Sequence, residues 1–475
     1  MSDDVAVIRT AFESLESASA HEARTPPRVD EIFAPDGHAA ALDPERPVVV
    51  GGRGMGKSFW AGALASPETL GHLAKAYPRL GLDECVVRLG FAAGDMQKGG
   101  PPSREVLNDL CGAGHSPETL WRAIVWRCAM ETMDRAVPGT WRETVARCAE
   151  DPERLQSELH RADAELQETG RKLVVVFDAL DRMGDDWAEI RRRSKALLRV
   201  ALAMRGYPRI KLKLFVRSDQ FADDALFDFP DASKLKTAAV DLQWARRDLY
   251  GLAFTRVRGD RAAHAAFDRL VACAVKGQLP YPGLESESAQ EMTFEALAGP
   301  YMGKGPRRGK TYPWLHNHLG DALGRVSPRS FLIALRQAAE HRPAPTNRVF
   351  DPKGLETGVR AASETRVDQL GEEHLWIKRA LEPLADLRVP CEAEDFRQRW
   401  EQAGTTREVR RAMDGREYPG PLEMAGNTSA DSDALLEALR RIAVVERRPD
   451  GRINIPDIFR IAAKLLKRGG VPPRR

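Results

Sequence analysis

The chain has 475 residues, more than one hydrophobic core normally supports, so its length predicts two or three domains. Its 43% hydrophobic and 30% charged residues are typical of a globular, water-soluble protein, and a net charge of +3 does not by itself mark a nucleic-acid binder. The apolar runs are too short to span a bilayer and the N-terminus is acidic and polar, which excludes a spanning segment and a secretory signal and predicts a cytoplasmic protein with no membrane partner.

The cysteines and the basic residues add two weaker indications. Six cysteines are scattered without a CxxC pair, which favours reduced, mostly buried thiols over metal ligands or disulfides. Basic residues exceed acidic ones in residues 301–342 and 431–475. That excess fits binding to phosphates or nucleic acid, and equally a solvated basic face.

The first 245 residues predict an N-terminal helix with its connector, over 1–44, and then an α/β core, over 45–245. The core alternates short apolar runs with longer helical patterns, as a doubly wound parallel sheet with helices on both faces requires. The expected strands are Pro47–Val50, Cys85–Phe91, Lys172–Phe177, Ile210–Val216 and Thr237–Leu242. The expected helices between them include Pro117–Thr132, Pro152–Thr169 and Trp187–Met204.

The remaining sequence predicts a helical lid over 246–345 and a C-terminal domain over 346–475. A proline-rich stretch near 342–346 indicates a hinge or linker between the two. Helical patterns follow near 366–385 and 391–414, then a polar loop, Tyr418–Asp433, and a last helix, Ala434–Ile442. Residues 444–455 predict a β-hairpin around Pro-Asp-Gly. A pair of helices followed by such a β-hairpin, the wing, is the outline of a winged-helix domain.

A glycine-rich loop follows the first predicted strand and carries the strongest functional pattern in the chain. It matches G-x-x-x-x-G-K-[ST] between a strand and a helix, in which backbone amides turn inward toward phosphate oxygens. Lys57 supplies a charge between the β- and γ-phosphates, and Ser58 offers its hydroxyl to Mg²⁺. The residues expected to contact the nucleotide here are Gly51, Gly52, Arg53, Gly54, Met55, Gly56, Lys57, Ser58 and Phe59. We therefore expect ATP and Mg²⁺ as ligands.

Two aspartates at the end of the third predicted strand complete the expected metal side of the site. Asp178 ends an apolar strand that we expect to neighbour the strand before the glycine-rich loop, so that its carboxylate reaches Mg²⁺ through water. Asp181, three residues later, is the candidate general base that orients the attacking water. The alternative for an acid at a strand end is a cap on the next turn.

Two arginines are candidate sensors of the γ-phosphate. Arg217 ends the fourth predicted strand, and its alternative role is a structural ion pair with Asp219 or Asp223. Arg329 follows Ser327 and Pro328, which are typical of a helix start, and from a lid domain it can reach the nucleotide. Its alternative is an ordinary exposed arginine.

A pair of histidines, His316 and His318, has no acid or cysteine beside it to complete a metal set. Packing or hydrogen bonding is therefore the expected role of both imidazoles.

Together, the GGRGMGKSFW loop, the VVVFDALDR strand end, the LFVRSD strand, the AVDLQW run and the SPRSF helix resemble the STAND/AAA+-like bacterial P-loop ATPases. The resemblance covers residues 40–342, and RPDGRINIPDIFRIAAKLLKRGG resembles the winged-helix tail of such proteins. It implies the additional-strand (ASCE) type of P-loop NTPase, an α-helical lid and a winged helix. No acid follows Asp178 directly, which resembles the slow, switch-like STAND branch rather than a processive motor.

The resemblance implies a slowly hydrolysing ATP-dependent switch that forms homo-oligomers or acts on an effector partner protein. Relatives of this kind work in bacterial conflict systems, including antiphage defence, or in regulation. The second hypothesis is a DNA-binding AAA+ protein, with residues 431–475 on double-stranded DNA through Arg447, Arg448 and Arg452. A small-molecule kinase fits less well, because the chain is long and the lid arginines are not clustered.

Overall fold

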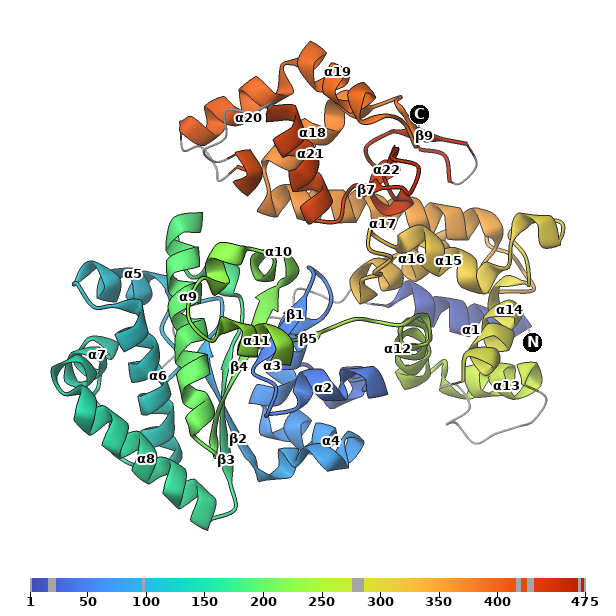
Figure 1. Ribbon diagram of the computed structural model, residues 1–475. Coiled ribbons are helices and arrows are strands. Elements are labelled where there is room, and N and C mark those ends of the chain that lie inside the picture. The colour runs from blue at the N-terminus through green and yellow to red at the C-terminus, as the bar shows by residue number, and fades with distance from the viewer. Residues whose placement is uncertain are drawn as a thin grey trace. The chain divides into compact units, whose positions relative to one another are not determined.

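The computed structural model describes residues 2–15, 23–95, 99–275, 286–415, 420–424, 431–468 and 471–473. The chain forms two compact units (Figure 1). The N-terminal unit comprises residues 20–243, and the C-terminal unit comprises residues 1–19 together with 244–475.

The N-terminal unit is built on a five-stranded parallel sheet in the order β2-β3-β4-β1-β5. The strands are β1 (Val48–Gly51), β2 (Cys85–Phe91), β3 (Lys172–Phe177), β4 (Ile210–Arg217) and β5 (Val240–Asp241). The helices of the unit are α2 (Ala39–Leu42), α3 (Lys57–Ala65), α4 (Pro67–Ala76), α5 (Arg104–Gly112), α6 (Pro117–Thr132), α7 (Trp141–Glu150), α8 (Pro152–Glu168), α9 (Trp187–Ala203), α10 (Ser218–Phe221) and α11 (Ala232–Ala238).

Helices cover both faces of this sheet, so most of its strand residues are apolar and buried (Figure 1). Alternate residues of β3, Leu173, Val175 and Phe177, join one core cluster with residues of α6 and α9. Helix α3 contacts the sheet through β2, β3 and β4 and buries Trp60 completely. The predicted doubly wound α/β core with a P-loop NTPase topology is confirmed.

Four of the five predicted strands lie within one residue of their expected bounds at each end. The fifth is shorter than predicted, because Thr237 belongs to helix α11 and only Val240 and Asp241 pair with β1. The three named helices are confirmed as α6, α8 and α9.

The C-terminal unit is mainly helical and includes the N-terminal helix of the chain. Its helices are α1 (Ser2–Glu13), α12 (Arg246–Gly259), α13 (His264–Ala274), α14 (Glu287–Ala298), α15 (Thr311–Leu319), α16 (Pro328–Glu340), α17 (Pro352–Glu373), α18 (Trp376–Leu381), α19 (Ala393–Ala403), α20 (Thr405–Asp414), α21 (Asp431–Arg441) and α22 (Asp457–Arg460). Its short strands are β6 (Arg388–Val389), β7 (Glu446–Arg447), β8 (Ile453–Asn454) and β9 (Leu466–Lys467).

Helix α1 packs against this unit rather than leading directly into the core. The Phe12 ring meets Phe350 edge-on, with 4.9 Å between centroids. The Arg9 guanidinium donates to the carbonyls of Pro345, Arg348 and Val349. These contacts hold α1 against the connection between α16 and α17.

The proline-rich stretch at 342–346 connects two helices that pack closely within one unit. A Cβ added to Gly358 of α17 would lie only 2.0 Å from the Ala334 carbonyl oxygen of α16. Helix α17 begins at Pro352, well before the helical pattern predicted from 366. The division of the C-terminal unit into a lid and a separate terminal domain stays a prediction.

The predicted hairpin at 444–455 is present, with β7 and β8 antiparallel and Glu446 opposite Asn454. Helix α21 ends just before it, and Cys391 pairs with Ile453 of the hairpin. Part of the polar loop predicted at Tyr418–Asp433 lies outside the described residues, and α21 already begins at Asp431.

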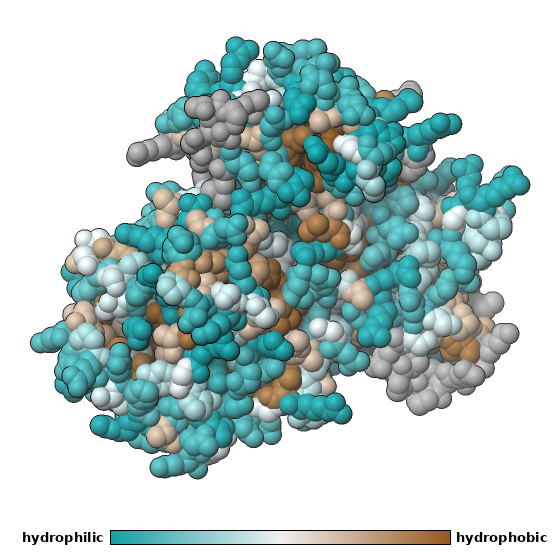
Figure 2. Space-filling view, in the orientation of Figure 1, coloured by the Kyte–Doolittle hydropathy of each residue, from teal (hydrophilic) through white to brown (hydrophobic). Residues whose placement is uncertain are grey.

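Hydrophilic side chains cover most of the face shown in Figure 2, as the charged composition requires. Within the described ranges, no helix combines the length and apolarity needed to cross a membrane.

Candidate functional site

The glycine-rich loop joins β1 to α3 and depends on two glycines in the left-handed backbone region. Gly54 has φ 77° and Gly56 has φ 95°, values that side-chain-bearing residues rarely adopt. Gly56 is also the N-cap of α3, so the first helical amides of Lys57 and Ser58 follow it directly. A glycine-rich turn that leads into the positive end of a helix is the arrangement that binds phosphate.

The Lys57 ammonium lies across this loop. Its Nζ donates to the carbonyl oxygens of Gly51 at 2.8 Å and Gly52 at 3.0 Å. The ammonium is thereby positioned where the β- and γ-phosphates of a triphosphate are expected.

The other residues predicted around the phosphates differ in exposure. Met55 is buried, whereas Arg53 and Phe59 are half-buried. The Phe59 ring packs edge-on against Trp60 of the same helix, with 5.2 Å between centroids. Nucleotide contacts by these three side chains stay predictions.

Asp178 lies at the end of β3 and contacts the loop's first helical turn. Its carboxylate accepts a hydrogen bond from the Ser58 hydroxyl. The sequence led us to expect that β3 and β1 are neighbours. They are not, because β4 lies between them. Since the carboxyl ends of parallel strands share one sheet edge, the contact forms across the intervening strand.

The Asp178 carboxylate is buried and incompletely satisfied. Its side chain is 2% exposed, and burial raises its pKa above the usual value, against the opposing effects of the Ser58 hydroxyl and the Lys57 charge. Its Oδ1 has no hydrogen-bond partner among the described residues. A buried carboxylate oxygen without a partner beside a serine hydroxyl fits the oxygen ligands that Mg²⁺ or its bound water takes.

The turn after Asp178 is strained and carries Asp181. Ala179 has φ 55° and ψ 43°, the left-handed region that alanine avoids at a cost of about 1 kcal/mol. A single 3-10 turn, Leu180–Arg182, follows it. Such backbone strain is characteristic of functional sites, and here it brings Asp181 to the same sheet edge as Asp178.

Arg217 connects the ends of β3 and β4. Its Nε and Nη2 donate to the two carboxylate oxygens of Asp219 at 2.9 and 2.8 Å, and its Nη1 donates to Asp181 Oδ2 at 3.2 Å. Asp223, the other acid considered for Arg217, pairs with Arg191 at 2.6 Å. Arg217 is therefore a paired arginine that lies beside the candidate base, and its part in sensing the γ-phosphate stays a prediction.

Asp219 is the residue whose role the sequence did not reveal. The sequence indicated it only as an alternative partner of Arg217. In the structure its carboxylate accepts two hydrogen bonds from the guanidinium, and this sets the direction of the remaining nitrogen, Nη1. The available signal was the R-S-D spacing at a strand end, which places both side chains on one short turn.

Arg329 belongs to the C-terminal unit, in the first turn of α16. The predicted helix start is confirmed, because the Ser327 hydroxyl accepts from the Ser330 amide at 3.1 Å and Pro328 occupies the first turn. The contact between Arg329 and a nucleotide stays a prediction.

His318 stacks on Trp314 at 4.1 Å between centroids and hydrogen-bonds its backbone carbonyl. No cluster of metal-ligating side chains occurs in the part of the chain that the structure describes.

Comparison with known proteins found no matching protein-family model and no matching curated protein. Among solved structures, the ORC2 protein of Aeropyrum pernix, in ADPNP–ADP complexes, has a TM-score of 0.39 at 13% identity, over 91% of this chain and 94% of that chain. The Walker-type ATPase paby2304 of Pyrococcus abyssi has a TM-score of 0.37 at 13% identity, over 91% and 96%. Cdc6p of Pyrobaculum aerophilum has a TM-score of 0.26 at 13% identity, over 86% and 83%. All three TM-scores are below 0.5, so these likenesses support no activity and no residue role for this chain.

Proposed function

We propose that this chain binds ATP with Mg²⁺, hydrolyses it slowly, and uses the nucleotide state as a switch for assembly with itself or with a partner protein. One observation carries the proposal. The Ser58 hydroxyl and the Asp178 carboxylate meet beside the glycine-rich loop, and Asp178 Oδ1 has no partner among the described residues. This set of donors fits a triphosphate with its divalent cation.

Each residue of the site has a role in this proposal. The loop amides and the Lys57 ammonium hold the phosphates, while Ser58 and Asp178 hold the cation or its water. When bound, Mg²⁺ neutralises charge that develops on the phosphates. Asp181 orients the attacking water and accepts its proton.

The ion pair between Asp181 and Arg217 supports slow turnover. Asp181 Oδ2 accepts from the Arg217 guanidinium at 3.2 Å, so this oxygen is already occupied and does not orient a water while the contact lasts. The Arg217 contact therefore has to change when the γ-phosphate arrives, which couples the nucleotide to the base. Coupling to Arg329 on a lid is the corresponding proposal for the C-terminal unit. A role in bacterial antiphage defence or in regulation is proposed from the sequence resemblance alone.

The test is to follow particle mass and turnover of the purified chain with and without ATP–Mg²⁺. The wild type should hydrolyse ATP slowly, and the mass of its particles should change when nucleotide is added. Lys57→Ala should lose the hydrolysis and the change in particle mass. Asp181→Ala should keep binding and lose turnover. Lys75→Ala, which removes an exposed lysine from α4, is the matched control and should behave as wild type. Fast turnover by a constitutive monomer would contradict the switch.

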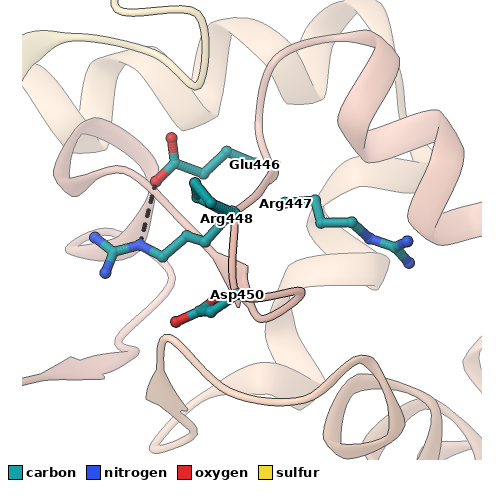
Figure 3. A pocket seen from close by; sticks show the side chains of 5 residues that line it. Glu446, Arg447, Arg448 and Asp450 are labelled. Atoms are coloured by element: carbon teal, nitrogen blue, oxygen red, sulfur yellow. Dashed lines mark ion pairs between the residues drawn. The ribbon is translucent and has the colours of Figure 1, made fainter.

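A second candidate function is binding of double-stranded DNA through the hairpin β7–β8 and its neighbours. The hairpin turn borders a hollow of about 430 Å³ lined by residues 446–450 (Figure 3). In Figure 3 the Arg447 side chain extends away from Glu446 and Asp450, and Arg447 is exposed. Arg448 and Arg452, in contrast, pair with Glu446 and Asp450 at 3.9 and 2.6 Å.

This hypothesis depends mainly on Arg447, because acids accompany the other two arginines. Arg447→Ala should weaken duplex binding and reduce its salt dependence by one phosphate contact. Unchanged duplex affinity in this variant would exclude the hairpin β7–β8 as the DNA-binding element.

A further inference from the structure

The connection between α14 and α15 forms a hairpin, residues 300–310, with an ordered base. Tyr301 pairs with Lys310 in an antiparallel bridge, and the Met302 amide donates to the Gly309 carbonyl at 3.0 Å. Next to this pair, the buried Thr311 donates its amide to the Pro300 carbonyl. Its hydroxyl donates to the Gly299 carbonyl at 2.6 Å. The base of this basic hairpin is therefore fixed to the helices behind it.

The tip of the basic hairpin is exposed and strongly cationic. Residues 299–310 contain Lys304, Arg307, Arg308 and Lys310 and no acidic residue. Lys310 pairs with Glu291 at 2.8 Å. Lys304, Arg307 and Arg308 are exposed and form no ion pair with any residue in the described ranges. Three cations on one short ordered turn, without an ion pair in the described ranges, create a local positive field.

Gly303 and Gly309 have no side chains that could keep the arginines of the tip away from an anionic surface. A Cβ on Gly303 would lie 2.8 Å from Arg308 Cγ, so the Arg308 stem lies over the Gly303 backbone. Gly309 has φ 85°, which lets the chain turn back without a side chain in the way.

We propose that the basic hairpin binds the sugar-phosphate backbone of duplex nucleic acid, independently of sequence and independently of the hairpin β7–β8. Arginine is well suited to phosphate because its planar donors bond two oxygens together. A membrane-binding loop would combine its cations with exposed apolar side chains, whereas residues 303–310 contain only Gly, Lys, Pro and Arg.

Single-stranded nucleic acid is disfavoured by the same composition. Binding to single strands depends on aromatic side chains that stack on unpaired bases. The nearest aromatic residue, Tyr301, is half-buried at the base of the basic hairpin rather than at its exposed tip. Duplex phosphates, which are contacted without stacking, are the better match.

The basic hairpin is also better suited to this role than the surface next to β7. The outward positions of α21 include Asp433 and Glu437, and Arg440 on the same helix pairs with Glu437. Asp433 likewise pairs with Arg397, so the arginines of this surface are held by acids and are less available to phosphate than the three cations of the basic hairpin. The proposal does not depend on the ATPase site, so it can fail or succeed separately from it.

The test measures binding of the full-length chain to a labelled mixed-sequence duplex of about three helical turns at several salt concentrations. The double variant Arg307→Ala/Arg308→Ala should lower the affinity at least about tenfold and reduce the salt slope by about two, since each phosphate contact contributes about 0.9. The matched control is Arg171→Ala/Arg205→Ala, two exposed arginines of the N-terminal unit with no ion pair among the described residues. It changes the net charge equally and should bind as wild type.

Three results would overturn the proposal. One is no duplex binding by the wild type at low salt. Another is a loss of binding in Arg447→Ala with none in the hairpin double variant. The third is stronger binding to anionic phospholipid vesicles or to single strands than to duplex. Melting temperatures of all variants should match the wild type, because the replaced side chains are exposed and make no ion pair with another described residue.

Discussion

The most informative residue at the candidate site is Asp178, because its burial and its hydrogen bonding together indicate a bound cation. A carboxylate that is 2% exposed, with one oxygen that has no hydrogen-bond partner among the described residues, is costly when nothing is bound there. The cost is offset when a cation binds. Burial raises the pKa of Asp178, so protonation competes with cation binding as pH falls. Affinity for ATP–Mg²⁺ should consequently decline with decreasing pH in the wild type and less so in Asp178→Asn.

Asp219 provides a separate prediction, because it positions Arg217 without needing to contact the nucleotide. Asp219→Asn removes the charge that holds the guanidinium, so Arg217 loses the fixed position from which we propose that it senses the γ-phosphate. We expect turnover to fall roughly 10–100-fold with little change in ATP–Mg²⁺ affinity, as misplacement of a catalytic group does. Asp223→Asn, which removes the charge that pairs with Arg191 and keeps an oxygen for the Ala225 amide, is the control. A variant Asp219→Asn that loses affinity and keeps its rate would contradict the assignment.

Lys213, on β4, is a fully buried lysine whose ammonium connects the sheet to the segment before β1. Its Nζ donates to the carbonyls of Ala41, Asp43 and Arg46 at 3.0, 2.5 and 2.7 Å. Burial lowers the pKa of Lys213 to about 7, below its ordinary value of 10.5. Between these values the unfolded chain holds a proton that the folded chain has released, so stability rises with pH.

Lys213→Met removes this dependence, which gives a test with a defined sign. The stability of the wild type relative to Lys213→Met should increase by up to about 1.4 kcal/mol per pH unit above pH 7 and level off near the unfolded pKa. Chemical denaturation of both proteins at several pH values in that interval measures it. A difference that stays constant with pH would show that the three carbonyls keep Lys213 charged throughout.

At the scale of elements, α16 and α17 pack closely because α17 carries glycines on the contact face. A Cβ at Gly358 would lie 2.0 Å from the Ala334 oxygen, so Gly358→Ala must separate the helices and should cost about 1–3 kcal/mol or more. Gly71→Ala in α4 meets nothing within 4 Å and should stabilise by about 0.5–1 kcal/mol. Thermal unfolding should shift in opposite directions for the two variants; a shared direction would contradict the packing.

These helices also show what sequence patterns miss. The start of α17 was not predicted, although Asp351 and Pro352 form a typical helix start, because Gly354 and Gly358 lower helix propensity. Close contact with α16 compensates for that loss, and such a contact is not visible in a local pattern. The strand β5 was overestimated for a related reason, since Thr237 continues helix α11 instead of extending the sheet.

The glycine-rich loop and the strand ends were predictable because their signals are local. Loop conformation follows from Gly54 and Gly56, and apolar runs mark strands that are buried on both faces. Strand order is not local. The sequence therefore suggested that β1 and β3 are neighbours. In the structure β4 separates them, and Arg217 at the end of β4 donates to Asp181. The packing of α1 on the C-terminal unit was missed for the same reason.

At the scale of the whole molecule, the two units divide the proposed functions. The N-terminal unit contains the loop, Asp178, Asp181 and Arg217, and the C-terminal unit contains Arg329, the basic hairpin and the hairpin β7–β8. A switch that couples ATP to assembly or to duplex binding therefore requires that nucleotide in one unit changes the affinity of the other. By linkage, duplex would then change ATP affinity by the same factor.

The most direct test of this account is the equilibrium affinity of the purified chain for ATP with and without Mg²⁺. The wild type should bind ATP more tightly with Mg²⁺ than without it. Lys57→Ala should bind weakly in both conditions, whereas Asp178→Asn should lose mainly the gain that Mg²⁺ provides. A wild type with no affinity for any nucleoside triphosphate, or with an affinity that neither substitution changes, would contradict the site described here.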